Sequence, residues 1–290
     1  HNTKNQFEVV TLDPHPAKDA DYFILEDVYA DHPKFDLAII CCPNHYHEEY
    51  VLGLKTRNMA KAILVEKPGL KDFATWALYS CTMDPNKLVM VKNNLYRTQT
   101  LEEIKKTIED NLYDITEINI DWLNKDRIPK PGSWFTNKEL AWGGVSRDLM
   151  PHLLSIYYAL FESTDEPMEQ IAIRKYTLED IDGSEYGEIE KENPVYDVDD
   201  QASILFNLSY KKQDIPVKLN ASWKTGADKS KIGVTIKIDN QSIFYDFGLC
   251  PEDAYYEMIT DTLNMTTKQY NKHKTIDSWI HQILDNYEQI

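Results

Sequence analysis

The chain has 290 residues, of which 48 are acidic and 31 are Lys or Arg, so its formal net charge is −17. This charge argues against nucleic acid or a membrane as a partner, because such anionic surfaces are held by clustered basic side chains. Hydrophobic residues make up 42% of the chain, which predicts a globular core. The four cysteines predict neither a disulfide framework nor a bound metal, and they fit a reducing, cytoplasmic location.

The first third of the chain alternates predicted strands with predicted helices. Short apolar runs indicate buried strands at residues 7–12, 35–42, 62–65 and 88–91. Helical spacing of apolar residues predicts helices between them, at 46–58 and 72–83. This alternation predicts βαβ units, and hence a Rossmann-like α/β domain with a parallel sheet at residues 1–97.

The rest of the chain, residues 98–290, predicts an α+β domain. Helical patterns cover 100–109, a segment ending at Leu160, and the chain from Asp253 onward. Strand patterns cover 115–122, 170–175, 202–210, 217–223, 231–239 and 242–247. The later strands follow one another across turn-like gaps, which predicts an open, mainly antiparallel meander. The acidic stretch Glu179–Glu192 is expected to be a mobile loop.

The first predicted strand ends in Asp13, where a dinucleotide-binding fold carries the acid that binds the adenosine ribose. The glycine-rich turn should lie about 20 residues earlier, yet the first glycine is Gly53 and no Gly-x-Gly occurs. Either the first βα unit is missing from this chain or the site is degenerate, and the abrupt start favours the first explanation. Asp13 can also be a simple turn residue before Pro14.

Three short segments carry residues suited to catalysis. They are Cys42-Pro43-Asn44-His45 at a strand end, then Glu66-Lys67-Pro68, then Gly143-Gly144 followed by Asp148 and His152. Their order and spacing resemble the signatures of the glucose-fructose oxidoreductase and inositol dehydrogenase family (Gfo/Idh/MocA), over nearly the whole chain. The resemblance implies an NAD(P)-dependent oxidoreductase whose second domain binds substrate and forms oligomers.

The resemblance implies that Lys67, Asp148 and His152 are catalytic. Lys67 would donate to the oxygen on the reacting carbon, where an ammonium stabilises the developing charge. His152 would take the hydroxyl proton, and Asp148, on the same helical face, would orient it or contact a substrate hydroxyl. The structural alternatives are a surface Glu66-Lys67 pair, a helix cap at Asp148 and a core position for His152.

The same resemblance places the cofactor against the ends of the parallel strands. The expected contacts are Asp13, Cys42, Pro43, Asn44, His47, Glu66, Lys67 and Asn94. NAD is favoured over NADP because the Asp13 carboxylate would repel a 2′-phosphate. Substrate would be held by Arg97, Trp134, Asp148 and His152. His45 and His47 can instead be ordinary helix residues, and Trp134 a core or interface residue.

The expected substrate is a sugar, a sugar derivative or an inositol. Ala221-Ser222-Trp223, Tyr255-Tyr256 and the residues after Asp148 resemble the aldose 1-dehydrogenase branch, but His152 stands where that branch carries Asn. Oxidation at C1 and oxidation of a ring hydroxyl therefore both stay open. The alternatives are a catalytically inactive dinucleotide- or sugar-binding regulator, and a sugar-binding or structural protein that uses no dinucleotide. A homodimer or homotetramer is expected, because exposed-sheet dimers are common in such folds.

Overall fold

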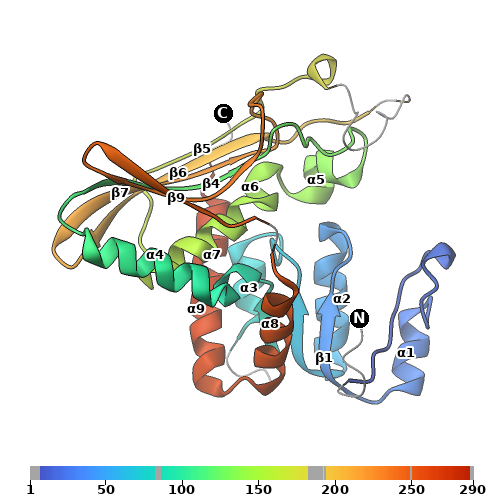
Figure 1. The fold of residues 1–290 in the computed structure, drawn as a ribbon. Helices are drawn as coiled ribbons and strands as arrows, with labels where there is room; N and C mark the ends of the chain where they lie inside the picture. The colour runs from blue at the N-terminus through green and yellow to red at the C-terminus, as the bar shows by residue number, and fades with distance from the viewer. Residues whose placement is uncertain (1–6, 82–85, 182–191, 193, 249, 288–290) are drawn as a thin grey trace.

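The computed structural model of the protein describes residues 7–81, 86–181, 192, 194–248 and 250–287. The described strands form two sheets, one of three strands and one of six. Helices pack on both sheets (Figure 1). The smaller, parallel sheet comes first in the chain and the larger, mainly antiparallel sheet second, so the expected fold class is confirmed. Most of the acidic stretch Glu179–Glu192 lies outside the described residues.

The small sheet consists of parallel strands in the order β1 (Phe35–Ile40), β2 (Ala60–Val65) and β3 (Lys87–Met90). The connections are helical, as expected: η2 (Asn44–Tyr46), α2 (His47–Thr56) and α3 (Phe73–Tyr79). The central strand β2 is almost wholly buried, because a parallel sheet is covered on both of its faces. Its carboxyl end therefore lies next to the ends of both neighbouring strands.

The expected strand at residues 7–12 does not form, and this prediction is wrong. Among the described residues, the segment pairs only through an isolated bridge between Leu12 and Tyr22, and Phe7 and Val9 are exposed. A strand needs a neighbour to satisfy its backbone groups, and the outer edge of β1 does not pair with this segment. Two short helices follow it, η1 (Pro16–Lys18) and α1 (Leu25–Asp31).

The large sheet contains the strands β4 (Ile115–Leu123), β5 (Glu169–Ile173), β6 (Gln201–Tyr210), β7 (Gln213–Ser222), β8 (Lys231–Ile238) and β9 (Gln241–Asp246). Their order in space is β5-β6-β7-β4-β8-β9. The expected meander is therefore interrupted, because β4 lies between β7 and β8, parallel to the first and antiparallel to the second. Alternating apolar residues identify a strand but leave its neighbours unspecified.

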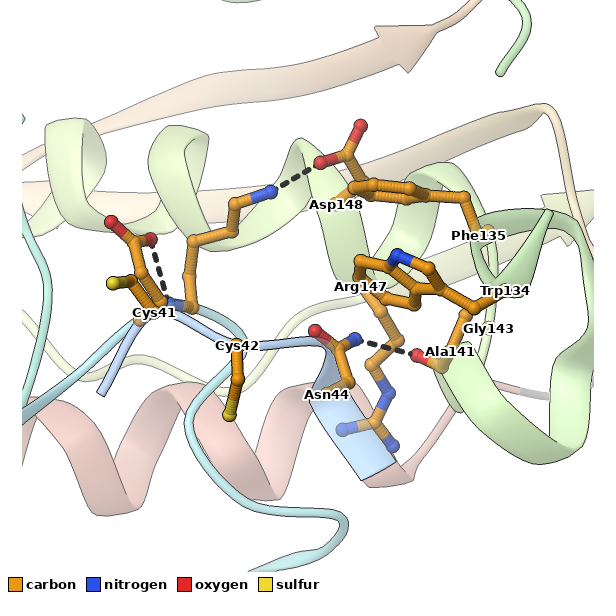
Figure 2. A pocket seen from close by; sticks show the side chains of 12 residues that line it. Cys41, Cys42, Asn44, Trp134, Phe135, Ala141, Gly143, Arg147 and Asp148 are labelled. Atoms are coloured by element: carbon orange, nitrogen blue, oxygen red, sulfur yellow. Dashed lines mark hydrogen bonds and ion pairs between the residues drawn. The ribbon is translucent and has the colours of Figure 1, made fainter. Parts of the chain in front are cut away.

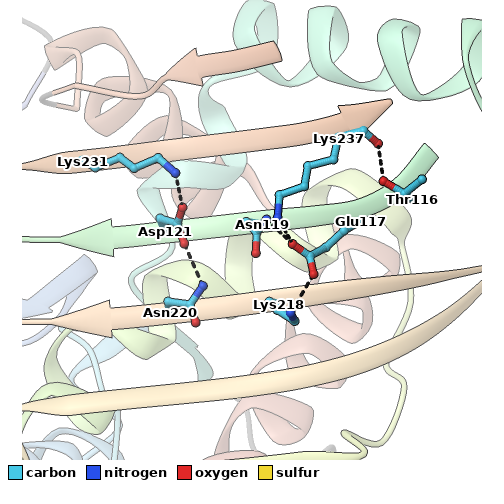
Figure 3. Close-up of polar contacts among 8 residues, drawn as sticks. All are labelled: Thr116, Glu117, Asn119, Asp121, Lys218, Asn220, Lys231 and Lys237. Carbon is cyan, nitrogen blue, oxygen red and sulfur yellow. Dashed lines mark hydrogen bonds and ion pairs between the residues drawn. The ribbon is translucent and has the colours of Figure 1, made fainter. Parts of the chain in front are cut away.

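The two faces of the large sheet differ in character. One face packs against α4 (Thr98–Asp110) and α7 (Met150–Phe161), which lie beneath the sheet in Figure 1. Figure 3 shows cross-strand ion pairs on the sheet: Glu117 of β4 pairs with Lys218 and Lys237 of the two neighbouring strands. Paired charges of this kind stay hydrated, so the apolar core lies on the helix-covered face.

The last two helices, α8 (Glu252–Asn264) and α9 (Thr267–Asp285), return to the small sheet. Helix α9 begins at a capping box formed by Thr266 and Gln269, and it packs against β3, α3 and α7. Helix α8 packs against β1, β2 and η3 (Asn93–Tyr96). In the described part of the chain, no helix is both long enough and apolar enough to cross a bilayer.

Candidate active site

The carboxyl ends of β1 and β2 open into a cleft. Its opposite wall is built from η4 (Trp134–Thr136), α5 (Lys138–Ala141) and α6 (Val145–Asp148), which connect β4 to α7 (Figure 2). Open α/β sheets bind their ligands beyond the carboxyl ends of the strands. The cleft is thus the expected location for a site, and it brings together residues from all three motif segments.

Lys67 lies two residues beyond the end of β2 and reaches across the cleft to Asp148. Its Nζ donates to Oδ1 of Asp148, which lies 81 residues later in the chain, and each side chain is 19% exposed. The backbone N–H of Lys67 donates to Oε2 of Glu66 at 3.2 Å, and the Lys67-Pro68 peptide bond is cis. Burial raises the pKa of Glu66, although the adjacent Lys67 opposes this.

The carboxylate of Asp148 is held on both oxygens. Trp223, at the end of β7, donates its indole N–H to Oδ2 at 2.8 Å, while Lys67 occupies Oδ1. Burial alone would raise the pKa of Asp148, but the Lys67 charge and these two hydrogen bonds outweigh burial, so the pKa is lowered. Local spacing does not predict this role for Trp223, because it cannot reveal a contact with a residue 75 positions earlier.

His152 lies close to this pair without hydrogen bonding to Asp148. The expected single helix is interrupted at Leu149, so Asp148 ends α6 while His152 lies in the first turn of α7, beside Pro151. The imidazole stacks on Trp122, with ring centroids 5.0 Å apart, and does not line the cleft. Burial and the Lys67 charge lower the pKa of His152 to about 3, so its ring is neutral near pH 7.

The residues after β1 form hydrogen bonds that connect the two walls of the cleft. Cys42 and Asn44 line the cleft, and Nδ2 of Asn44 donates to the carbonyl oxygen of Ala141 at 2.9 Å. His47 is fully buried, and its ring nitrogens lie 2.9 Å from the Cys42 carbonyl oxygen and 2.8 Å from that of Gly69. A neutral imidazole has one N–H and so donates to one of these carbonyls at a time. His47 therefore connects the loops after β1 and β2.

Four other predicted site residues lie in different surroundings. Trp134 lines the cleft and stacks on Phe135 at 3.8 Å between ring centroids. Arg97 is 7% exposed, and its guanidinium donates to Oδ1 of Asn94 at 2.9 Å and to the carbonyl oxygens of Phe247 and Gly248. Asp13 accepts from the backbone N–H of His15 at 2.8 Å. The structure does not place Arg97, Asn94 or Asp13 on the cleft surface.

The glycine pair before Asp148 has a steric explanation. A Cβ atom on Gly144 would lie 1.7 Å from the carbonyl oxygen of Asp199. Only glycine, which has no Cβ atom, avoids this steric clash. The Asp199 carboxylate accepts from the backbone N–H groups of Gly144 at 2.8 Å and Ser146 at 2.7 Å. This capping interaction fixes the start of α6 and so directs Asp148 toward Lys67. Arg147 and Phe135, which no sequence motif marks as site residues, also line the cleft.

The cleft suits the nicotinamide half of a dinucleotide. The loops after β1 and β2 supply charged side chains and backbone groups at the sheet edge where such a cofactor binds. The glycine turn that would hold the pyrophosphate is not found among the 290 residues, which contain no Gly-x-Gly. Over the described ranges, no group of three or more His, Cys, Asp or Glu side chains forms a metal site.

No protein-family model matches the chain. One curated relative from Amycolatopsis mediterranei, named as a UDP-kanosamine synthase oxidoreductase subunit, is 24% identical over 119 residues. The match spans 41% of this chain and 32% of that protein, so it covers about a third of the relative.

Solved structures match nearly the whole chain. GenD2 from gentamicin A biosynthesis, in complex with NAD, superposes with a TM-score of 0.68 at 15% identity and covers 94% of this chain and 80% of its own. Levoglucosan dehydrogenase in complex with NADH gives 0.66 at 17% identity, covering 96% and 89%. At these identities the likeness shows the fold. The chain has the fold of the Gfo/Idh/MocA-type sugar oxidoreductases, a Rossmann-like sheet followed by an open, mainly antiparallel sheet.

Proposed function

We propose that the protein is an NAD(P)-dependent oxidoreductase. It would transfer a hydride between nicotinamide and a hydroxyl or carbonyl carbon of a sugar, a sugar derivative or an inositol. The observation that carries this proposal is the Lys67–Asp148 ion pair, which crosses the cleft at the carboxyl ends of the parallel strands. Similar structures named as complexes with NAD or NADH, one of them a levoglucosan dehydrogenase, support it.

The side chains of the cleft divide the chemistry among them. The bound nicotinamide supplies or accepts the hydride. The Lys67 ammonium has three donors and gives one to Asp148, so others remain for the oxygen on the reacting carbon. Its charge stabilises a developing alkoxide, and the ionised Asp148 keeps it in place. We assign acceptance of the hydroxyl proton to His152, whose neutral ring lies beside the Lys67–Asp148 pair rather than on the cleft surface. We assign stacking on a sugar ring to Trp134, which lines the cleft.

We assign the cofactor to the first half of the cleft. Cys42, Asn44 and Glu66, which line the cleft, would face the nicotinamide and its ribose, together with Pro43 at the start of η2. Asp13 would bind the adenosine ribose, which favours NAD over NADP. His47 would support the cofactor loops, because it connects the chain after β1 with the loop after β2. Asn94 and Arg97 lie away from the cleft surface, where the Arg97 guanidinium donates to Asn94 and to the carbonyl oxygens of Phe247 and Gly248.

Domain organisation and assembly are part of the same proposal. We assign residues 1–97 to the dinucleotide-binding domain and residues 98–290 to the substrate-binding and oligomerisation domain. A cytoplasmic location fits four cysteines that are all free thiols. The proposed assembly is a homodimer or a homotetramer.

Turnover of a panel of aldoses and inositols with NAD and NADP tests the function. A Lys67→Met variant should bind dinucleotide like the parent, yet lose about 100- to 1,000-fold in kcat, the usual cost of one transition-state donor. Lys61→Met is the matched control, because Lys61 is an exposed lysine on the same strand that pairs with Asp36. Binding without turnover would indicate the regulatory alternative, and failure to bind either dinucleotide would overturn the proposal.

A further inference from the structure

Helix α9 presents three polar side chains at four-residue intervals, Asp277, His281 and Asp285, which we call the polar stripe of α9. Residues four apart lie on one face of a helix and are separated by roughly 6 Å along its axis. Each member binds a segment near the cleft, and each of these segments lies more than a hundred residues earlier in the chain.

His281 holds the loop that carries Lys67. The backbone N–H of Leu70 donates to Nε2 of His281 at 3.1 Å, and Nδ1 of the same ring donates to the Asp277 carbonyl oxygen at 2.7 Å. The ring is fully buried and stacks on Trp76, with centroids 4.4 Å apart. These contacts fix the neutral tautomer, with its proton on Nδ1 and its acceptor directed at the loop.

The fit around the same loop is tight. A Cβ atom on Gly69, which has a φ of +87°, would lie 2.7 Å from the His281 ring. The loop between Lys67 and Leu70 therefore has little room to shift relative to α9. Because Lys67 is three residues from Leu70, a displacement of the loop also moves the base of the Lys67 side chain.

Asp285 holds the helix that carries Asp148. Its Oδ1 accepts from Nη2 of Arg147 at 3.0 Å, and its Oδ2 accepts from the backbone N–H of Phe73 at 2.6 Å. Arg147 directly precedes Asp148 in α6, and Phe73 begins α3, just beyond the Lys67 loop. One carboxylate thus connects the two sides of the Lys67–Asp148 ion pair.

Asp277 completes the stripe under the neighbouring strand. Its Oδ1 pairs with Nζ of Lys92, and its Oδ2 accepts from the backbone N–H of Met90 at 3.1 Å. Neither Lys92 nor Asp277 is exposed beyond 2%. The Lys92–Asp277 pair holds α9 against the end of β3. His281 and Asp285 therefore project from a helix whose position is fixed.

We propose that the polar stripe of α9 positions the catalytic ion pair. His281 fixes the position of the loop that carries Lys67, and Asp285 fixes the position of the helix that carries Asp148. The inference rests on the proposed function of that pair. None of the three side chains lines the cleft, so each is a positioning residue that acts through Lys67 or Asp148. Misplacement of a reacting group by about 1 Å can cost roughly 100-fold in rate.

Turnover of stripe variants tests the proposal. His281→Leu removes the acceptor for Leu70 and should lower kcat by about 10- to 100-fold, the range for loss of an outer partner, with the KM for dinucleotide unchanged. His281→Gln places an amide oxygen near the position of Nε2 and should recover most of this loss. In a Lys67→Met background, His281→Leu should cost nothing further, because the residue through which it acts is gone.

Trp279→Phe is the matched control on the same helix. Trp279 is 6% exposed and donates its indole N–H to the Asp165 carbonyl oxygen at 2.9 Å, away from the Lys67 loop. This variant also removes one buried hydrogen bond of α9, and its kcat should equal that of the parent. Equal losses in Trp279→Phe and His281→Leu, or an unchanged kcat in His281→Leu, would overturn the proposal.

A second readout separates this proposal from the proposed function. The rate at which an amine-selective acylating reagent modifies Lys67, followed by mass spectrometry, needs no turnover. His281→Leu and Asp285→Ala should both raise this rate, because Lys67 loses its contact with Asp148. If the parent protein turns over no substrate, the proposed function fails, and the stripe is then judged on this rate alone. An unchanged rate in both variants contradicts positioning.

Discussion

At the scale of single residues, the site depends on the geometry of one carboxylate. Asp148 has both oxygens occupied, by Lys67 and by the indole of Trp223, so its orientation is fixed before substrate arrives. Such preorganisation is the main way a protein stabilises charge that develops in a reaction. The same two hydrogen bonds keep Asp148 ionised although burial opposes its charge.

Trp223→Phe tests this arrangement by removing the indole N–H while keeping an aromatic ring. A hydrogen bond to a charged group is worth about 1.5–3 kcal/mol, so the pKa of Asp148 should rise and kcat should fall about tenfold. Steady-state kinetics measured across a pH series report both effects. A variant with the kcat and pH profile of the parent would show that Lys67 alone holds Asp148.

His152 leads to a prediction about pH. An ordinary histidine titrates near pH 6.5, whereas burial and Lys67 lower the pKa of His152 to about 3. The unfolded chain therefore binds more protons between these values, and the contribution of His152 to stability, present above pH 6.5, is lost as the pH falls toward 3. The acid limb of kcat/KM should lie well below pH 6.5. A midpoint near 6.5 that disappears in His152→Gln would contradict the neutral ring.

The sequence was informative about which residues matter in the cleft and less so about their partners. It singled out Lys67 and Asp148, and the structure brings them into contact. It did not predict the hydrogen bond from Trp223 to Asp148, because local spacing carries no information about a contact between the end of a strand and a distant helix. Arg97 donates a hydrogen bond to Asn94 away from the cleft surface. Both side chains are buried, and buried polar groups need hydrogen-bond partners.

At the scale of elements, the polar face of the large sheet is held by charge. Glu117 of β4 accepts hydrogen bonds from Lys218 at 2.6 Å, Lys237 at 2.6 Å and Asn119 at 2.8 Å. Burial alone would raise its pKa, but these three donors lower it to about 2. The Glu117 carboxylate pairs with a lysine on each side and so connects the three adjacent strands β7, β4 and β8. A single ion pair would connect only two strands.

Glu117→Gln should reduce the free energy of unfolding by about 1 kcal/mol at pH 7, the upper value for a surface ion pair. The native pKa is depressed, so the contribution is complete above pH 4.5 and is lost as the pH falls toward 2. Urea unfolding at several pH values should show the difference between parent and variant shrinking with acid. Glu257→Gln on α8 serves as an exposed control. A difference that is independent of pH would contradict the ionic origin.

The buried pair between β3 and α9 affects stability more strongly. Lys92 and Asp277 are both inaccessible to solvent, and removal of one partner from such a pair typically costs about 3–5 kcal/mol because a buried charge is left alone. Lys92→Met should show this loss in chemical unfolding. Lys92→Met combined with Asp277→Leu should recover a large part of it. A double variant that is less stable than the single variant would show that the pair itself is strongly stabilising.

Most elements could be predicted from the sequence, but their neighbours could not. Helix α4 has Leu101, Ile104 and Ile108 at helical spacing, and all three are buried as this pattern predicts. The strand predicted at residues 7–12 fails because β-strand formation depends on pairing, which the apolar pattern does not report. Strand β4 illustrates the same limit, since only the folded sheet shows it between β7 and β8.

At the scale of the whole molecule, the two ends of the chain build one site. The parallel strands at the start supply Lys67, the helices after β4 supply Asp148, and α9 at the end braces both. Figure 1 shows α8 and α9 below the large sheet, beside the strands of the small one. The larger of the two apolar clusters in the described part of the chain includes residues of both sheets and of α9. The cleft is therefore positioned by contacts that span the chain.

The central claim is that the cleft transfers a hydride between a sugar carbon and nicotinamide, assisted by Lys67. Incubation of the protein with NAD and sugars deuterated at single carbons, followed by NMR of the dinucleotide, tests it most directly. The account predicts deuterium on the nicotinamide ring from one labelled carbon, with transfer greatly reduced in Lys67→Met. Absence of deuterium on the ring with every sugar and inositol, or equal transfer by Lys67→Met, would contradict it.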